Sequence, residues 1–122
     1  MSENIFTELA SGVLRIEMRR PEKKNALTGP MYAAMADALE RAAREDAVRV
    51  VLIHGQPGVF TAGNDLGDFL NGPTNDPNRP VFRFLRNIAA AEKPLVAAVA
   101  GNAVGVGTTM LLHCDLVYAG ES

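Results

Sequence analysis

Apolar positions recur along the chain with two alternating spacings, one of two residues and one of about 3.6 residues. The first spacing is typical of a strand with one buried face, and the second is typical of a helix that packs on a core. The repeated change between them favours strands that alternate with helices, rather than a helical bundle or a β-sandwich. We therefore predict an α/β fold.

The N-terminal part of the pattern predicts a hairpin followed by a helix. Residues 5–9 and 13–18 have the alternation of two strands, with Ser11 and Gly12 in the turn between them. Thr28 suits the N-cap of the helix, and Pro30 suits its first turn. The apolar stripe of this helix, which we interpret as core packing and not as a ligand site, consists of Met31, Met35, Ala38, Leu39 and Ala42.

The rest of the chain continues the alternation. Residues 72–80 are dense in glycine, proline and asparagine and predict a mobile surface loop. The order of elements suggests a repeating ββα spiral, although no residue-level repeat supports it. The remaining predicted elements are strands at 48–54, 95–99 and 116–119 and helices at 81–91 and 104–113.

Two glycine-bearing segments follow predicted strands. They are residues 60–66, FTAGNDL, and residues 93–107, KPLVAAVAGNAVGVG. Tight turns at strand ends can direct backbone N–H groups at a developing negative charge. A single such turn more often only reverses the chain. The two together predict an oxyanion hole.

Composition limits the functions that fit. A chain of 122 residues with 48% hydrophobic content predicts a single domain. A net charge of −2 argues against binding to nucleic acid or to a membrane surface. A local basic cluster, which is either a solvated loop or a site for a small anionic ligand, contains Arg19, Arg20, Lys23 and Lys24.

The single cysteine, Cys114, excludes an internal disulfide and favours a reducing compartment. The N-terminus has no signal-peptide pattern, and no apolar run approaches the ~20 residues of a membrane span. We therefore expect a cytoplasmic protein. His113, Cys114 and Asp115 are adjacent without a second pair of ligands, so we predict no metal site. Gly101, Gly105 and Gly107 lack the spacing of a nucleotide-binding loop.

Three motifs together resemble the crotonase superfamily, the enoyl-CoA hydratases and isomerases. They are NAL at 25–27 after RP at 20–21, FTAGNDL at 60–66, and the segment 93–115. The resemblance covers essentially the whole chain in the family's order. It implies the ClpP/crotonase-like ββα-superhelix fold, an acyl-CoA thioester as ligand and a reaction through a thioester enolate. It also implies no cofactor besides the coenzyme A of the substrate, and a homotrimer or a dimer of trimers.

The same resemblance assigns site residues. It implies the backbone N–H groups of Ala62 and Val106 as oxyanion donors, with the helix that opens near Val104 adding its positive end. We expect Asn25 to tie down its loop and Asp65 to bond nearby backbone N–H groups. The resemblance places Lys23, Lys24, Asn25, Ala26 and Leu27 at the nucleotide end of coenzyme A, and Gly63, Asn64, Asp65 and Gly105 in the thioester-binding turns.

Position 109 bears on whether the reaction is hydration or isomerisation. Hydratases of this family have a glutamate where this chain has Thr109, so the sequence is more similar to the 3,2-enoyl-CoA isomerase branch. Isomerisation needs one carboxylate, which in that branch lies beyond the equivalent of Ser122. We therefore expect residues 1–122 to be an N-terminal portion without the C-terminal catalytic and trimerisation segments.

Three other functions remain open. The protein could be a hydratase that uses a single downstream carboxylate, or an acyl-CoA-binding fragment without catalysis. Likeness to the Clp-type serine proteases is an analogy of fold only, with Thr108 or Thr109 as nucleophile and His113 as base. His113 follows these threonines on one predicted helix, and no serine stands in the turn, so we rank this function last.

Overall fold

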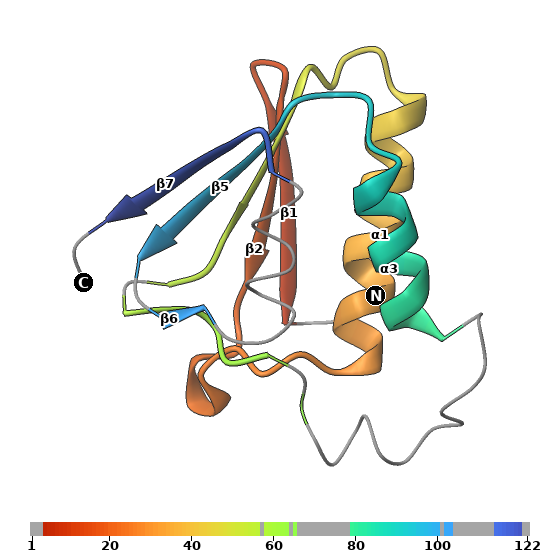
Figure 1. Ribbon diagram of the computed structural model, residues 1–122. Helices are drawn as coiled ribbons and strands as arrows, with labels where there is room; N and C mark the ends of the chain where they lie inside the picture. The colour runs from red at the N-terminus through yellow and green to blue at the C-terminus, as the bar shows by residue number, and fades with distance from the viewer. Residues whose placement is uncertain are drawn as a thin grey trace.

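The computed structural model shows a sheet with helices α1 and α3 side by side against one of its faces (Figure 1). This arrangement confirms the α/β class. The parts of the chain that the structure describes are residues 4–56, 58–63, 65, 79–100, 102–103 and 114–120.

The main sheet has five strands in the order β1-β2-β3-β5-β7. The first two pair antiparallel and all the others pair parallel. Ser11 and Gly12, in the turn between β1 and β2, have φ values of 53° and 82°, and positive φ at both turn residues suits the twist of a tight hairpin. The strands are β1 (Ile5–Ala10), β2 (Val13–Met18), β3 (Val50–His54), β5 (Leu95–Ala100) and β7 (Leu116–Gly120).

The helices begin where the sequence provides N-terminal signals. Helix α1 (Gly29–Arg44) has Thr28 as its N-cap, whose side chain accepts a hydrogen bond from the Met31 N–H. Helix α3 (Pro80–Ala89) has Pro80 in its first turn. The predicted helix at 81–91 is therefore confirmed with its end two residues earlier.

The core lies between these helices and one face of the sheet. Alternate residues of β2 and β3 point into it, while Met31 and Met35 of α1 are fully buried. The interpretation of the methionines as core packing is confirmed. Tyr32 of α1 and Phe84 of α3 pack with ring centroids 5.6 Å apart, so apolar contact joins the two helices as well.

A second, two-stranded sheet was not predicted from the sequence. It joins β4 (Val59–Thr61) to β6 (Asn102–Ala103) in parallel. Strands of three and two residues are too short to show a hydrophobic period. A short 3-10 helix, η1 (Pro21–Lys23), was missed for the same reason. The predicted helix at 104–113 and nearly all of the predicted loop at 72–80 lie outside the described residues.

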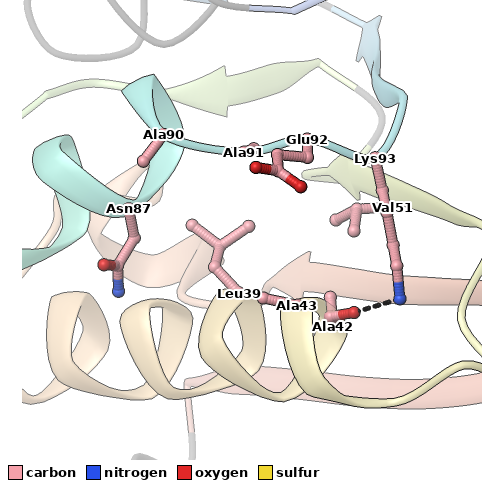
Figure 2. Close-up of a pocket in the computed structure, with 9 residues that line it drawn as sticks. All are labelled: Leu39, Ala42, Ala43, Val51, Asn87, Ala90, Ala91, Glu92 and Lys93. Atoms are coloured by element: carbon pink, nitrogen blue, oxygen red, sulfur yellow. Dashed lines mark hydrogen bonds between the residues drawn. The ribbon is translucent and has the colours of Figure 1, made fainter.

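A cavity of about 340 Å³ lies between the C-terminal ends of α1 and α3 and the start of β3 (Figure 2). Lys93 crosses its wall and donates hydrogen bonds to the carbonyl oxygens of Ala42 and Glu45 at the end of α1. Ligands of parallel sheets bind at the carboxyl ends of the strands. This cavity lies at the opposite ends, so we do not take it as the functional site. No helix in the described part of the chain is long and apolar enough to cross a bilayer.

Candidate active site

The small sheet brings the two glycine-bearing segments together. Strand β4 leads into residues 62–65, and β6 leads toward residues 104–107. The strands are parallel, with Val59 opposite Asn102 and Thr61 opposite Ala103. The carboxyl ends of the two strands therefore lie next to each other, which is the starting arrangement that an oxyanion hole built from two turns requires.

The first turn depends on a glycine. Gly63 is buried and has φ of 90°, a conformation that side-chain-bearing residues rarely adopt. Its N–H donates to the Thr61 hydroxyl oxygen at 3.1 Å, and that hydroxyl donates to the Asn25 carbonyl oxygen at 2.6 Å. Thr61 is completely buried. The turn is thus held in one shape by a side chain that sequence reasoning did not select.

The backbone N–H groups of this turn change the assignment of the donor. The Ala62 N–H donates to the Lys24 carbonyl oxygen at 3.0 Å, and the Asp65 N–H donates to the Leu27 carbonyl oxygen at 2.8 Å. The Gly63 N–H bonds Thr61. The expectation that Ala62 offers its N–H to a substrate oxyanion therefore conflicts with the structure, because that N–H is already bonded within the chain.

The other predicted members of the two turns lie outside the described residues. These are Asn64, next to Gly63, and Gly105 and Val106 in the second turn. The suggested contribution of the helix at Val104, and the roles weighed for Thr108, Thr109 and His113, lie there as well.

The loop before α1 packs directly on the first turn. Lys23 and Lys24 are exposed, as a site for anionic groups requires, whereas Asn25 and Leu27 are buried. Leu27 donates its N–H to the Gly63 carbonyl oxygen and accepts from the Asp65 N–H, so its backbone is bonded to the first turn on both sides. Ala26 is partly exposed, and its carbonyl oxygen accepts a hydrogen bond from Arg20.

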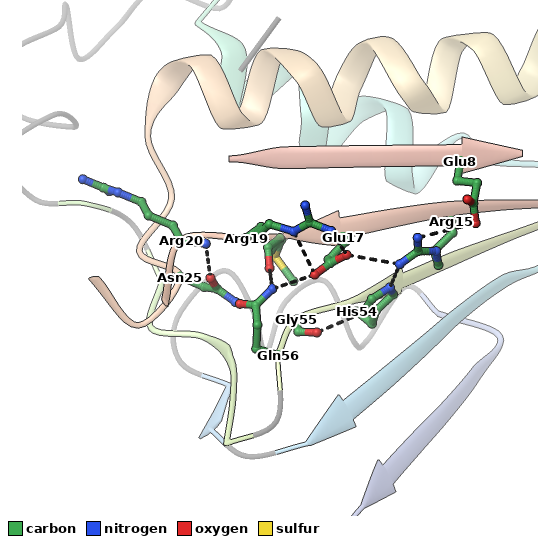
Figure 3. A network of polar contacts seen from close by, with 10 residues as sticks. Glu8, Arg15, Glu17, Arg19, Arg20, Asn25, His54, Gly55 and Gln56 are labelled. Carbon is green, nitrogen blue, oxygen red and sulfur yellow. Dashed lines mark hydrogen bonds and ion pairs between the residues drawn. The ribbon is translucent and has the colours of Figure 1, made fainter. Parts of the chain in front are cut away.

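Asn25 ties this loop to its surroundings, as expected, rather than contacting a ligand through its side chain. Its Oδ1 accepts from the Arg20 N–H at 2.6 Å (Figure 3), and its Nδ2 donates to the Phe60 carbonyl oxygen at 3.0 Å. Both ends of the amide are therefore used inside the protein.

Asp65 forms an ion pair with Arg20. Its Oδ2 accepts a hydrogen bond from the Arg20 guanidinium at 2.8 Å, which also donates to the Ala26 carbonyl oxygen at 2.9 Å. From the sequence, Arg20 was placed in a basic cluster and in the RP motif at 20–21. No local signal pairs it with a carboxylate 45 positions away, so this ion pair was missed.

Elsewhere the described residues provide no competing site. No group of three His, Cys, Asp or Glu side chains among them is arranged to hold a metal ion. Burial raises the pKa of the Cys114 thiol to about 11, with a further contribution from neighbouring Asp115. A thiol with this pKa is protonated near neutrality and is a weak nucleophile.

Comparison with known proteins identifies the family to which this site belongs. A family model described as enoyl-CoA hydratase/isomerase matches residues 8–122. The chain belongs to this family. The resemblance to the crotonase superfamily is thereby confirmed.

Relatives within the enoyl-CoA hydratase/isomerase family differ in the reactions that they are named for. The chain is 36% identical to 1,2-epoxyphenylacetyl-CoA isomerase of Escherichia coli K12, over 100% of this chain and 49% of that protein. It is 35% identical to 2,3-dehydroadipyl-CoA hydratase of the same organism, over 100% of this chain and 48% of that protein. The family is therefore established, while these relatives include both an isomerase and a hydratase.

Solved structures of similar sequence have the same fold. The structure of a putative enoyl-CoA hydratase/carnithine racemase from Magnetospirillum magneticum AMB-1 superimposes with a TM-score of 0.92 at 50% sequence identity, covering 98% of this chain and 47% of that one. The structure of Pseudomonas aeruginosa OdaA superimposes with a TM-score of 0.93 at 51% sequence identity, covering 98% of this chain and 48% of that one. The crotonase-like fold is confirmed. The chain spans about half the length of the relatives that it matches.

Proposed function

We propose that the complete protein binds an acyl-CoA thioester with the thioester carbonyl at the carboxyl ends of β4 and β6. The observation that carries this proposal is the parallel pairing of β4 with β6, which starts the two glycine-bearing segments side by side. Support also comes from the family, because both relatives described above are named for CoA thioester substrates. Lys23 and Lys24, both exposed beside the first turn, are proposed to meet the phosphates of the nucleotide.

The chemistry that this arrangement serves is the formation of an enolate. Removal of a proton from C2 of a thioester moves negative charge onto the carbonyl oxygen. Fixed N–H donors that wait at that position lower the barrier, and loss of one donor typically reduces the rate by about two to three orders of magnitude. Backbone donors suit this role because the turn fixes them before the charge develops.

We assign the donor of the first turn to Asn64 in place of Ala62. The described N–H groups of this turn, those of Ala62, Gly63 and Asp65, all bond within the chain, so we propose the N–H of Asn64 as the donor. Val106 is proposed as the donor of the second turn.

We propose isomerisation of a 3-enoyl-CoA to a 2-enoyl-CoA as the reaction. A carboxylate takes the proton from C2, the double bond moves from C3–C4 to C2–C3, and the same group returns a proton to C4. Thr109, standing where hydratases of the family have a glutamate, favours this reaction because one carboxylate is then sufficient. That carboxylate is proposed to lie in sequence corresponding to the second half of the relatives.

The test uses the protein made from the complete gene. A 3-enoyl-CoA is added, and the conjugated 2-enoyl-CoA is followed by its ultraviolet absorbance and by mass-resolved chromatography. We expect conversion without a change of mass. Addition of water to a 2-enoyl-CoA, without isomerisation, would replace the proposal by the hydratase alternative. Binding without turnover would favour a non-catalytic acyl-CoA binder, and absence of binding would overturn the proposed ligand class.

A further inference from the structure

Two segments that lie far apart in the sequence are joined by three backbone hydrogen bonds beside the proposed site. The first segment is residues 24–27, which begins with the exposed Lys24, and the second is residues 62–65, which contains the first turn. Lys24 accepts from Ala62 at 3.0 Å, while Leu27 donates to Gly63 and accepts from Asp65, both at 2.8 Å. A displacement of one segment therefore displaces the other.

Buried side chains strengthen this connection. Asn25 donates to the Phe60 carbonyl oxygen at 3.0 Å, and Thr61 donates to the Asn25 carbonyl oxygen at 2.6 Å. Both side chains are completely buried. A Cβ atom at Gly55 would lie 2.7 Å from the Phe60 carbonyl oxygen and 2.9 Å from Asn25 Nδ2. Packing here leaves little room for the loop and the turn to move separately.

The ion pair between Arg20 and Asp65 is a further connection between the loop and the turn. Arg20 donates to Asp65 at 2.8 Å and to the Ala26 carbonyl oxygen at 2.9 Å from the same nitrogen. The two charged side chains are 16% and 25% exposed. An ion pair that is largely shielded from water and also bonded to backbone fixes geometry better than an exposed pair.

The loop is strained in the conformation that these bonds hold. Lys24 and Asn25 have φ of 52° and 56°, in the left-handed region that residues with a side chain rarely adopt. Such conformations persist only where surrounding contacts enforce them, and they concentrate at functional sites. The N–H groups of Lys24 and Asn25 bond the carbonyl oxygens of Pro21 and Arg20 within the loop, and the bonds to the turn add to this restraint.

We propose that the nucleotide half of the thioester, bound at Lys23 and Lys24, fixes the first turn through the Lys24–Ala62 hydrogen bond and the Arg20–Asp65 ion pair. Arg20 and Asp65 are positioning residues in this scheme. The inference rests on the proposed function for the location of the nucleotide, and it adds the coupling between the two subsites.

The coupling predicts a kinetic signature. Binding energy from a remote part of a substrate raises kcat only when it is used to organise the reacting centre, and otherwise it lowers KM alone. We therefore expect the nucleotide to raise kcat as well as to lower KM when an acyl-CoA is compared with the matching acyl-pantetheine.

The first experiment needs no turnover. Adenosine 3′,5′-bisphosphate, which reproduces the nucleotide, is added to the complete protein, its affinity is measured by calorimetry, and amide hydrogen exchange is followed at Ala62, Gly63 and Asp65. We expect exchange at these amides to slow by about fivefold or more, the lower end of typical coupling between two sites. Arg20→Met should bind the nucleotide with similar affinity and lose most of this protection, while Arg20→Lys should retain part of it.

A matched control separates this effect from general loss of an ion pair. Arg41→Met removes another arginine–carboxylate pair of 2.8 Å, that with Glu45 at the end of α1, and should leave the protection unchanged. Nucleotide binding with unchanged exchange at the three amides in the parent protein would overturn the inference and leave the proposed function standing. Absence of nucleotide binding would overturn both.

The second experiment compares acyl-CoA with acyl-pantetheine as substrates. In the parent protein, kcat should be higher for acyl-CoA than for acyl-pantetheine. In Arg20→Met the two kcat values should become nearly equal, while KM should remain lower for acyl-CoA. A nucleotide effect confined to KM in the parent protein would contradict the coupling.

Discussion

The buried side-chain amide of Asn25 forms hydrogen bonds to the backbone of two segments, one at Arg20 and one at Phe60. Its oxygen accepts from the Arg20 N–H and its nitrogen donates to the Phe60 carbonyl oxygen. Asparagine also tolerates a left-handed backbone better than most residues, and Asn25 has φ of 56°. The residue thus satisfies two requirements at once, a donor and acceptor in one side chain and an unusual backbone conformation.

Substitutions at Asn25 should separate these two requirements. Asn25→Ala leaves the Phe60 carbonyl and the Arg20 N–H without their partner, and we expect a loss of about 2–3 kcal/mol in the free energy of unfolding. Asn25→Gly loses the same bonds but tolerates the left-handed conformation, so it should be less destabilised than Asn25→Ala by about 1 kcal/mol. Urea denaturation of the complete protein measures the free energy of unfolding of each variant. Equal stability of Asn25→Ala and the parent protein would contradict this role.

Glu17 should contribute to stability in a way that depends on pH. Hydrogen bonds from Arg19, assisted by Gln56, lower the pKa of this carboxyl to about 2 from its usual 4.5 (Figure 3). A pKa lowered by folding gives stability that is complete above the usual value and is lost as the pH falls from about 4.5 toward 2. The loss should be about 1 kcal/mol, because the neighbouring arginines are partly exposed.

Glu17→Gln tests this dependence. The variant lacks the titrating group, so its stability should fall less between pH 5 and pH 2.5 than that of the parent protein, as measured by thermal unfolding at several pH values. Glu22→Gln, at an exposed position, is the matched control and should follow the parent curve. Parallel curves for Glu17→Gln and the parent protein would refute the assignment.

Helices α1 and α3 are in contact through a buried aromatic pair and through partly exposed ion pairs, and these two contacts should contribute differently to stability. Phe84 is completely buried against Tyr32. Arg83, 31% exposed, donates to Glu40 at 2.7 and 2.8 Å and to Asp37 at 2.6 Å. These bonds lower the pKa of Glu40 to about 2, with Arg83 as the largest cause. Exposed ion pairs nevertheless stabilise proteins little, so packing should dominate this interface.

Two substitutions on neighbouring positions of α3 compare the contacts. Phe84→Ala should lower the free energy of unfolding by about 3–5 kcal/mol, because it leaves a cavity at the centre of the interface. Arg83→Met keeps most of the aliphatic stem and should lower it by less than about 1 kcal/mol, with a smaller effect at high salt. Chemical denaturation at two salt concentrations distinguishes them. A larger effect of Arg83→Met than of Phe84→Ala would contradict this ranking.

At the scale of the whole molecule, elements with a clear period were predictable and the contacts between distant segments were not. The predicted strand 13–18 matches β2, and Thr28 caps α1 as expected, since both depend on local sequence. Strand β4 is only three residues long, and it pairs with β6 at positions more than 40 residues away. A period of two cannot be recognised in so few residues.

The candidate site shows the same division. Gly63 was predicted to lie in a tight turn, and its positive φ, a local property that favours glycine, confirms the turn. Arg20, Thr61 and the bonded state of the Ala62 N–H were missed, because each depends on pairing between the loop at 20–27 and the turn at 62–65. Sequence motifs selected the two turns as a candidate site, and tertiary hydrogen bonds determine which of the described N–H groups are already bonded within the chain.

The most direct test of the central claim is the infrared carbonyl stretch of a bound thioester. A saturated acyl-CoA labelled with ¹³C at the thioester carbonyl is added to the complete protein, and the isotope-edited difference spectrum isolates that one bond. If two backbone N–H groups polarise the carbonyl at the ends of β4 and β6, the stretch shifts to lower frequency on binding and the band narrows. A bound thioester whose carbonyl frequency equals that in water would contradict the oxyanion hole.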